Sequence, residues 1–339
     1  MITAETFGRV DGQSVRAFTL QNTNGLRAKV LTYGARLAEL WVPDRAGTLA
    51  NIVLGHDRVE DYVNGTAYFG ATCGRYANRI RDGRFSLDGV QHQLDLNEGG
   101  NTLHGGPQGF DQKLWEVERA EGCSITFRTN SPDGEMGFPG DCVLRCTYSL
   151  GEDDRLTVVM QAETDAATVI NIVNHAYFNL AGAGSGDCLG QLLRVDADHY
   201  TPVGPGLLPT GELAPVAGTP FDFRTLRPIG QGMEAVAAGY DHNWCLNGSG
   251  MRDVVEAVDP KSGRRMVLAT NEPGVQLYVG GYIPEGLAGS GGKTYGRFEG
   301  FTLETQKYPD SPNQPHFPSA RLNSGQEYRH EMVFSFSVE

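Results

Sequence analysis

Apolar and polar side chains alternate along much of this chain, which is typical of strands with one buried face. Apolar residues hold every second position in 142–150 and again in 156–162, and the tetrad Gly-Glu-Asp-Asp at 151–154 separates the two runs. This arrangement predicts a β-hairpin. The C-terminal run alternates in the same way, with Tyr328 and Met332 on one face and Arg329 and Glu331 on the other, so we expect a half-buried last strand.

Short apolar runs between clusters of Gly, Pro and Asn predict further strands, at residues 26–30, 35–42, 124–128, 192–195, 265–269 and 275–280. Helical periodicity is scarce, and only 59–62 and 233–238 are expected to form short helices. Many strands without intervening helices of about 10–15 residues favour an antiparallel arrangement over an α/β one. The predicted fold class is therefore all-β, a large antiparallel β-sandwich with few short helices.

The length of 339 residues fits about two average domains or one large all-β domain. The Gly-rich stretch 181–190 and the Pro/Gly-rich stretch 202–220 are the candidate linkers. Both are loop-sized, and strand patterns of the same style continue on either side of them. We therefore expect residues 1–339 to form a single domain.

The charge balance narrows the classes of ligand. Lys and Arg number 28 and Asp and Glu number 41, a formal net charge of −13, which argues against nucleic acid or an anionic membrane as a partner. The first residues lack the features of a secretory signal, and no apolar run approaches about 18 residues, so a cytoplasmic location is expected. An uncharged or cationic small molecule is the predicted ligand.

The cysteines give no sign of a zinc site or a redox pair, because the six of them are scattered without a CxxC spacing. In a chain of this length we expect them to be small buried hydrophobic residues: Cys73, Cys123, Cys142, Cys146, Cys188 and Cys245. The HExxH, GxSxG and phosphate-loop patterns are also missing from the sequence. We therefore predict no metal and no cofactor.

Candidate chemistry lies in five loop clusters, 74–81, 101–106, 174–180, 240–244 and 303–313. Each cluster combines a titratable group with Gly, Asn or aromatic neighbours. Fixed donors and acceptors beside a flat apolar surface are what a polyol ligand needs. Without metal-binding, GxSxG or phosphate-loop motifs, the chemistry left to consider is that of carboxylate, imidazole and guanidinium groups acting on an uncharged substrate.

Each titratable residue in these clusters has two interpretations. His104 precedes two glycines, so it is either an exposed functional imidazole or an ordinary turn residue. His175 is either an acid/base group or a hydrogen-bonded, half-buried histidine. Glu304 interrupts an apolar alternation, so it is either an outward-facing strand glutamate or an inward-pointing carboxylate, which must be paired or functional. Asp241 is either a site residue or a turn residue.

Taken together, the clusters resemble the aldose 1-epimerase (galactose mutarotase) family. The resemblance covers nearly the whole chain, and its motifs occur in the family's order: GRYANRI, NTLHGG, NHAYFNL, YDHN, PGVQLY and LETQKYPDSPN. The family's fold is a large antiparallel β-sandwich, a galactose mutarotase-like supersandwich, with an open cleft for the sugar. The implied activity is the cofactor-independent interconversion of the α and β anomers of free aldoses such as galactose and glucose.

The resemblance also implies roles for individual residues. Glu304 would be the general base and His175 the general acid, so that the carboxylate takes the anomeric proton while the imidazolium protonates the ring oxygen. The residues expected to bind the sugar are Asn78, Arg79, His104, Asp241, Gln276 and Tyr177. The expected partner is a monosaccharide, and the oligomeric state stays open.

The implied chemistry requires an ionised Glu304 beside a protonated His175. We expect the carboxylate to raise the pKa of the imidazole. We also expect Arg79 to hold Glu304 ionised, at some cost to the protonation of His175.

Alternatives remain at this stage. Small departures from the family pattern, at Gly204, Trp244, Leu277 and Val279, leave the preferred sugar open and permit a mutarotase specialised for pentoses. A non-catalytic sugar-binding or regulatory protein on the same sandwich is a second possibility. A polysaccharide lyase or glycosidase is a third, and a glycosidase would need a carboxylate facing Glu304, for which Asp241 is the candidate.

Overall fold

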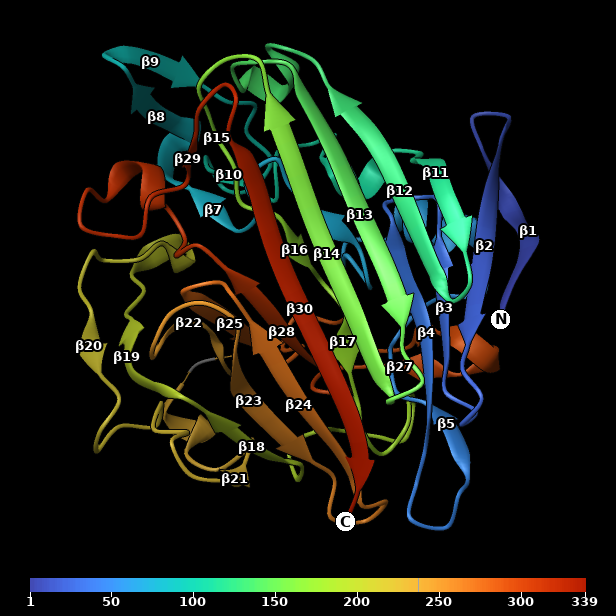
Figure 1. Ribbon diagram of the computed structural model, residues 1–339. Helices are drawn as coiled ribbons and strands as arrows, with labels where there is room; N and C mark the ends of the chain where they lie inside the picture. Colours follow the sequence, from blue (N-terminus) through green and yellow to red (C-terminus); the bar gives the residue numbers. More distant parts are fainter. Residues whose placement is uncertain (237) are drawn as a thin grey trace.

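Antiparallel sheets account for nearly all of the regular structure in a computed structural model that describes residues 1–236 and 238–339 (Figure 1). The predicted all-β fold class is therefore confirmed. Two large sheets carry half of the strands of the described residues, and a third sheet is built from the N-terminal segment.

The largest sheet has nine strands, and the long C-terminal strand β30 runs through it between β14 and β24 (Figure 1). In spatial order its strands are β11 (Glu116–Glu121), β12 (Ser124–Ser131), β13 (Cys142–Leu150), β14 (Arg155–Thr164), β30 (Glu327–Val338), β24 (Arg264–Thr270), β23 (Arg252–Val258), β18 (Leu192–Val195) and β21 (Arg227–Pro228). The predicted hairpin is β13 and β14, paired from Cys142 opposite Thr164 to Leu150 opposite Leu156.

The second sheet has six strands, in the order β17 (Tyr177–Phe178), β28 (Phe301–Gln306), β25 (Gly274–Tyr278), β22 (Asp241–Leu246), β19 (Ala197–Thr201) and β20 (Ala214–Pro215). The N-terminal sheet has the order β1 (Ile2–Val10), β2 (Gln13–Gln21), β3 (Arg27–Leu31), β4 (Arg36–Pro43) and β5 (Leu49–Asn51). Within these sheets, neighbouring strands pair in antiparallel fashion.

Short two-stranded ladders fill the loops between the sheets: β6 (Thr72–Cys73) with β16 (Val173–Asn174), β7 (Arg79–Ile80) with β10 (Thr102–Leu103), β8 (Arg84–Leu87) with β9 (Val90–Gln93), β15 (Thr168–Val169) with β29 (Arg321–Leu322), and β26 (Leu287–Ala288) with β27 (Thr294–Tyr295). The α-helix α1 spans Val59–Asn64. Single 3₁₀ turns occur at Arg81–Gly83, Phe110–Gln112, Glu135–Gly137, Pro205–Leu207, Met233–Ala235, Ser290–Gly292 and Ser311–Asn313.

Two predicted elements end earlier than their sequence pattern suggested. The strand predicted at 275–280 stops at Tyr278, and Gly280 has a φ of +69°, a left-handed conformation that cannot continue a strand. The helix predicted at 233–238 is only the 3₁₀ turn Met233–Ala235, because Val236 has an extended backbone and ends it. Residue 237 of that prediction lies outside the described residues. The helix predicted at 59–62 is confirmed as α1.

One large apolar cluster lies between the sheets. It draws side chains from Phe18 near the N-terminus to Phe336 near the C-terminus, and the alternating residues Leu144, Cys146 and Tyr148 of β13 belong to it. The expectation of buried cysteines holds for five of the six, and Cys123 is half-buried. Among the described residues, no helix has the length and apolar character needed to cross a membrane.

Candidate active site

Three adjacent strands of the six-stranded sheet present polar side chains on one face. Gln276 of β25 lies directly opposite Glu304 of β28 on one side and Asn243 of β22 on the other. Residues directly opposite each other in an antiparallel pair share a face of the sheet, and so do residues two apart on one strand. Asp241, two residues before Asn243, therefore joins Glu304 and Gln276 on this face.

His175 reaches Glu304 from the short connection between β16 and β17. Because Tyr177 of β17 pairs with Thr302 of β28, this connection is held against the strand that carries Glu304. The His175 Nε2 atom lies 3.5 Å from Glu304 Oε1, and both side chains are buried. Thr302 Oγ1 also donates a hydrogen bond of 3.0 Å to Glu304 Oε1.

The ladder of β7 and β10 brings Asn78 and His104 together. Both residues have positive φ, and the Asn78 backbone N–H donates to His104 Nδ1 at 3.3 Å. Of the two interpretations of His104, an exposed functional imidazole and an ordinary turn residue, the first does not hold as stated, since His104 is buried. Gly105 serves close packing instead, because a Cβ there would lie 1.9 Å from the Gly74 carbonyl oxygen.

These segments surround a cavity of about 650 Å³. Within the described part of the chain, its lining includes seven of the eight predicted site residues: Asn78, Arg79, His104, His175, Tyr177, Asp241 and Glu304. The eighth, Gln276, lies behind the wall and donates a 2.6 Å hydrogen bond to Asp241 Oδ1. The wall also contains residues that sequence reasoning did not single out, among them Tyr68, Glu98, Tyr278 and Tyr282.

Glu98 is the most consequential of these unpredicted residues. Arg79 donates to it through two parallel hydrogen bonds, Nε to Oε2 at 2.7 Å and Nη2 to Oε1 at 2.6 Å. From the sequence we expected Arg79 to hold Glu304 ionised, whereas its guanidinium forms a two-pronged ion pair with Glu98. Glu98 stands in the turn sequence Asn-Glu-Gly-Gly, where an acidic residue is ordinary, so the sequence carried no signal for this contact.

The protonation of the central pair differs from the sequence-based expectation. Burial raises the pKa of Glu304 to about 8, and the neighbouring charge of Arg79 offsets this only weakly. Burial lowers the pKa of His175 to about 3, and the positive charge of Arg36 lowers it further. The expected rise of the imidazole pKa is therefore wrong: burial lowers the pKa of His175, and burial also raises the pKa of Glu304, which disfavours the carboxylate charge that was expected to attract the imidazolium.

These opposite shifts have a simple consequence for the pair. Between pH values of about 3 and about 8 it holds one proton, and that proton resides on Glu304. The pair is then a neutral acid beside a neutral imidazole. In addition, His175 Nδ1 and Glu304 Oε2 are buried atoms without a hydrogen-bond partner among the described residues.

His104, His175 and Glu304 also form a group that sequence spacing did not reveal. Each offers one metal-ligating atom, and these atoms lie within 4.8 Å of one another. The three residues come from separate segments of the chain, so no spaced motif links them. Two imidazoles and a carboxylate are chemically suited to a transition metal, which makes metal dependence a property to test.

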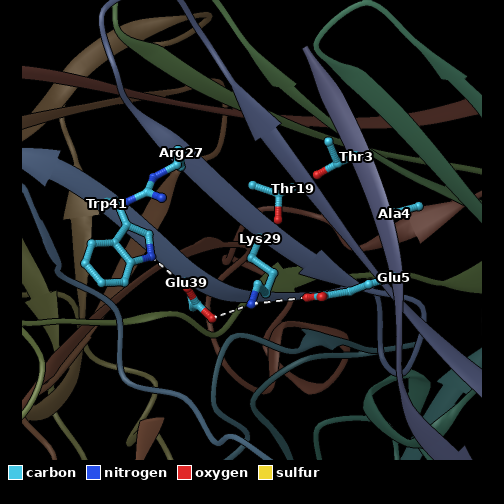
Figure 2. Close-up of a pocket in the computed structure, with 8 residues that line it drawn as sticks. All are labelled: Thr3, Ala4, Glu5, Thr19, Arg27, Lys29, Glu39 and Trp41. Carbon is cyan, nitrogen blue, oxygen red and sulfur yellow. Dashed lines mark hydrogen bonds and ion pairs between the residues drawn. The ribbon is translucent and has the colours of Figure 1, made fainter. Parts of the chain in front are cut away.

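A second hollow of about 330 Å³ lies on the N-terminal sheet and carries none of the predicted site residues (Figure 2). Several of its polar groups are paired with one another. Lys29 Nζ lies 3.4 Å from Glu5 Oε1 and 2.8 Å from Glu39 Oε1, and Trp41 Nε1 donates to Glu39 Oε2 at 2.6 Å. The larger cavity, with its closely spaced acid and base groups, is therefore the candidate active site.

Comparison with known proteins identifies relatives of this chain in both sequence and structure. A sequence profile of the family described as Aldose 1-epimerase matches residues 16–335. The human protein named galactose mutarotase is 41% identical over 341 residues, which cover 99% of this chain and 99% of that protein. The aldose 1-epimerase of Escherichia coli (strain K12) is 34% identical over 338 residues and 97% of each chain. A crystal structure of an aldose epimerase homologue from C. elegans superimposes with a TM-score of 0.89 at 30% identity, covering 94% of this chain and 98% of its own.

Proposed function

We propose, from the premise that this chain belongs to the aldose 1-epimerase family, that Glu304 and His175 transfer the protons by which it interconverts the α and β anomers of free aldoses. The chain is thus an isomerase. The observation that supports these two roles is the buried 3.5 Å contact between His175 Nε2 and Glu304 Oε1 on the cavity wall. A non-catalytic sugar-binding protein would not need both groups in contact, since either one alone can form a hydrogen bond with a sugar hydroxyl.

Ring opening follows from proton transfers at these two groups. Glu304 takes the proton of the anomeric hydroxyl, the C1–ring oxygen bond breaks as C1=O forms, and His175 delivers its proton to the ring oxygen. Rotation about the C1–C2 bond presents the other face of the aldehyde. Reclosure returns both protons, so the pair regains its starting state and no other reactant is consumed.

Burial of the pair favours the ring-opened stage of this cycle. Before ring opening the pair must be ionic, with the proton on His175. Afterwards it is neutral, with the proton on Glu304, and this is the arrangement that the pKa shifts of both groups favour. The loss of solvation that makes the ionic form costly thus stabilises the open-chain aldehyde complex relative to the cyclic one.

We further propose a neutral monosaccharide as the substrate, bound within one domain that comprises residues 1–339. The single large core supports one domain, and the relatives named galactose mutarotase make galactose the first sugar to test. Of the four departures from the family pattern, Gly204 lines the cavity, whereas Trp244, Leu277 and Val279 belong to the core. Of these four residues, Gly204 is therefore the one placed to influence the preferred sugar.

Polarimetry tests the proposed function directly. The protein is expected to accelerate the change in optical rotation of freshly dissolved α-D-galactose, and comparison with α-D-glucose and α-D-xylose ranks the sugars. Dialysis against EDTA is expected to leave the rate unchanged, because the two proton transfers need no Lewis acid. A rate that is lost on dialysis and restored by Zn²⁺ would instead assign His104, His175 and Glu304 to a metal. No acceleration of any sugar would contradict the proposal.

The pH dependence of kcat/KM is a second test. The active form of the pair holds one proton, so kcat/KM should fall above pH about 8, where the pair loses it, and below pH about 3, where His175 gains a second one. Burial thus widens the active range, since an unshifted pair would be active only between the ordinary pKa values of 4.5 and 6.5. An alkaline limb near 6.5 in the measured profile would contradict this protonation scheme.

A further inference from the structure

Side-chain amides continue from the candidate active site along the same face of the central strands. Asn243 lies two residues after Asp241 on β22, and Gln306 lies two residues after Glu304 on β28. Both are essentially inaccessible to solvent, at 1% and 0% exposure. On β25 between them, Gly274 stands opposite Gln306. These residues sit beneath the cavity wall, next to Gln276.

Hydrogen bonds join the amides into a chain that ends at Asp241. Gln306 Nε2 donates to Asn243 Oδ1 at 3.2 Å and to Gln276 Oε1 at 3.3 Å. Gln276 Nε2 in turn donates to Asp241 Oδ1 at 2.6 Å. Asp241 lines the cavity, whereas Gln276 and Gln306 do not belong to its described lining.

The donor-to-acceptor order of this series of hydrogen bonds follows from the chemistry of the side chains in it. An ionised carboxylate only accepts hydrogen bonds, so Gln276 must turn its amide nitrogen toward Asp241. The Gln276 oxygen then faces the other way and needs a donor, which the Gln306 amide supplies. Each orientation therefore dictates the next, and the outcome is a fixed position for one oxygen of Asp241.

Two further observations indicate that the arrangement serves the site. A Cβ at Gly274 would lie 2.5 Å from Asn243 Oδ1, so the missing side chain is what gives the amides room. Asn243 Nδ2 and Gln306 Oε1, moreover, find no partner in the described part of the chain. Buried polar atoms without partners destabilise a fold, and apolar side chains would fill the same space at lower cost.

We propose that Gln306 is a positioning residue for sugar binding, which orients the Gln276 amide and thereby aims the Asp241 carboxylate at a sugar hydroxyl. The inference rests on the proposed function and deepens it. Gln306 does not touch the sugar, and its effect is transmitted through two hydrogen bonds. Its loss should therefore weaken sugar binding without impairing the proton transfers of Glu304 and His175.

Two substitutions separate this role from simple packing. Gln306→Met keeps the length of the side chain but removes the donor, and we expect KM for galactose to rise about 3- to 10-fold while kcat stays within about twofold. Gln306→Glu replaces the donor with a carboxylate that repels both oxygens at alkaline pH. At acidic pH the introduced carboxyl group is protonated and can donate to Gln276 Oε1. The ratio of variant to wild-type KM should therefore fall as the pH is lowered.

The wild-type KM is measured at each pH as the reference, so that the titration of Glu304 and Asp241 cancels in the ratio. Circular dichroism checks that each variant is folded. In a Gln276→Met background, Gln306→Met should cause no further rise in KM, because the hydrogen bonds that connect Gln306 to Asp241 are already broken. Additive effects of the two substitutions, a loss of kcat as large as the rise in KM, or a pH-independent KM ratio for Gln306→Glu would each overturn the proposal. An inactive wild type would contradict the proposed function instead, and galactose affinities from calorimetry would still test the positioning role.

Discussion

Replacing Glu304 with glutamine is expected to lower kcat by about 10²–10⁴-fold, because the amide cannot accept the proton of the anomeric hydroxyl. Glutamine has nearly the size of glutamate, and its oxygen can still accept the hydrogen bond that Thr302 Oγ1 gives to Glu304 Oε1. KM should therefore change much less than kcat. Polarimetry on α-D-galactose over a range of concentrations measures both parameters.

Asp241→Asn is the matched control, since it also exchanges a carboxylate for an amide on the cavity wall. We expect it to raise KM by about tenfold and to have a smaller effect on kcat than Glu304→Gln, because Asp241 binds the sugar and transfers no proton. Equal losses of kcat in the two variants would refute this division of roles.

Unfolding experiments provide an independent check on the Glu304→Gln variant. The pKa of Glu304 rises from its ordinary 4.5 to about 8 on folding, so between these values the folded state binds more protons than the unfolded one. This residue therefore makes the free energy of unfolding decrease as the pH rises through that range. The variant should lose this part of the decrease, and a cooperative unfolding transition at the assay pH would show that its low activity does not come from instability.

Replacing His175 with asparagine is the second change with a large expected effect, again about 10²–10⁴-fold in kcat. Without the imidazole, water must protonate the ring oxygen, and the residual rate depends only on the ionised fraction of Glu304. That fraction grows as the pH approaches and passes the Glu304 pKa of about 8. The residual activity of the variant should therefore rise with pH over the range in which the wild-type activity falls.

His242→Asn is the control for this reversal of the pH profile. His242 is buried, and burial lowers its pKa to about 4, yet it lies on the opposite side of β22 from Asp241 and packs against Phe221. Its replacement should leave the shape of the wild-type pH profile unchanged. If the His175→Asn activity followed the wild-type profile at a reduced level, His175 would not be the general acid.

Glu98 explains why Arg79 does not keep Glu304 ionised. The two-pronged ion pair satisfies the guanidinium with a carboxylate at the mouth of the cavity, where Glu98 is about one-third exposed. The negative charge of Glu98 therefore offsets much of the effect that the positive charge of Arg79 would have on the pKa of Glu304. Desolvation of Glu304 is then the largest influence on its pKa, and the pair keeps its proton at neutral pH.

Much of the strand content and many residues of the candidate site could be predicted from the amino-acid sequence. Alternation with a period of two is a local property, so it correctly located the hairpin of β13 and β14 and the long strand β30. The ordered motifs identified the family resemblance and with it seven of the residues that line the cavity. Both kinds of signal can be recognised in the sequence, because the alternation along a strand and the spacing within a motif depend on residues that are close together in the chain.

The electrostatics of the site and its supporting contacts depend on how distant segments meet in the folded protein. The proton of the pair resides on Glu304 because both groups are buried by segments far apart in sequence, and no local pattern records how much water such a fold excludes. The partner of Arg79 depended on how one turn folds over the cavity. The amide chain from Gln306 to Asp241 depended on the register of three strands. A pKa and a hydrogen-bond partner are set by neighbours in space, and those exist only once the sheets have assembled.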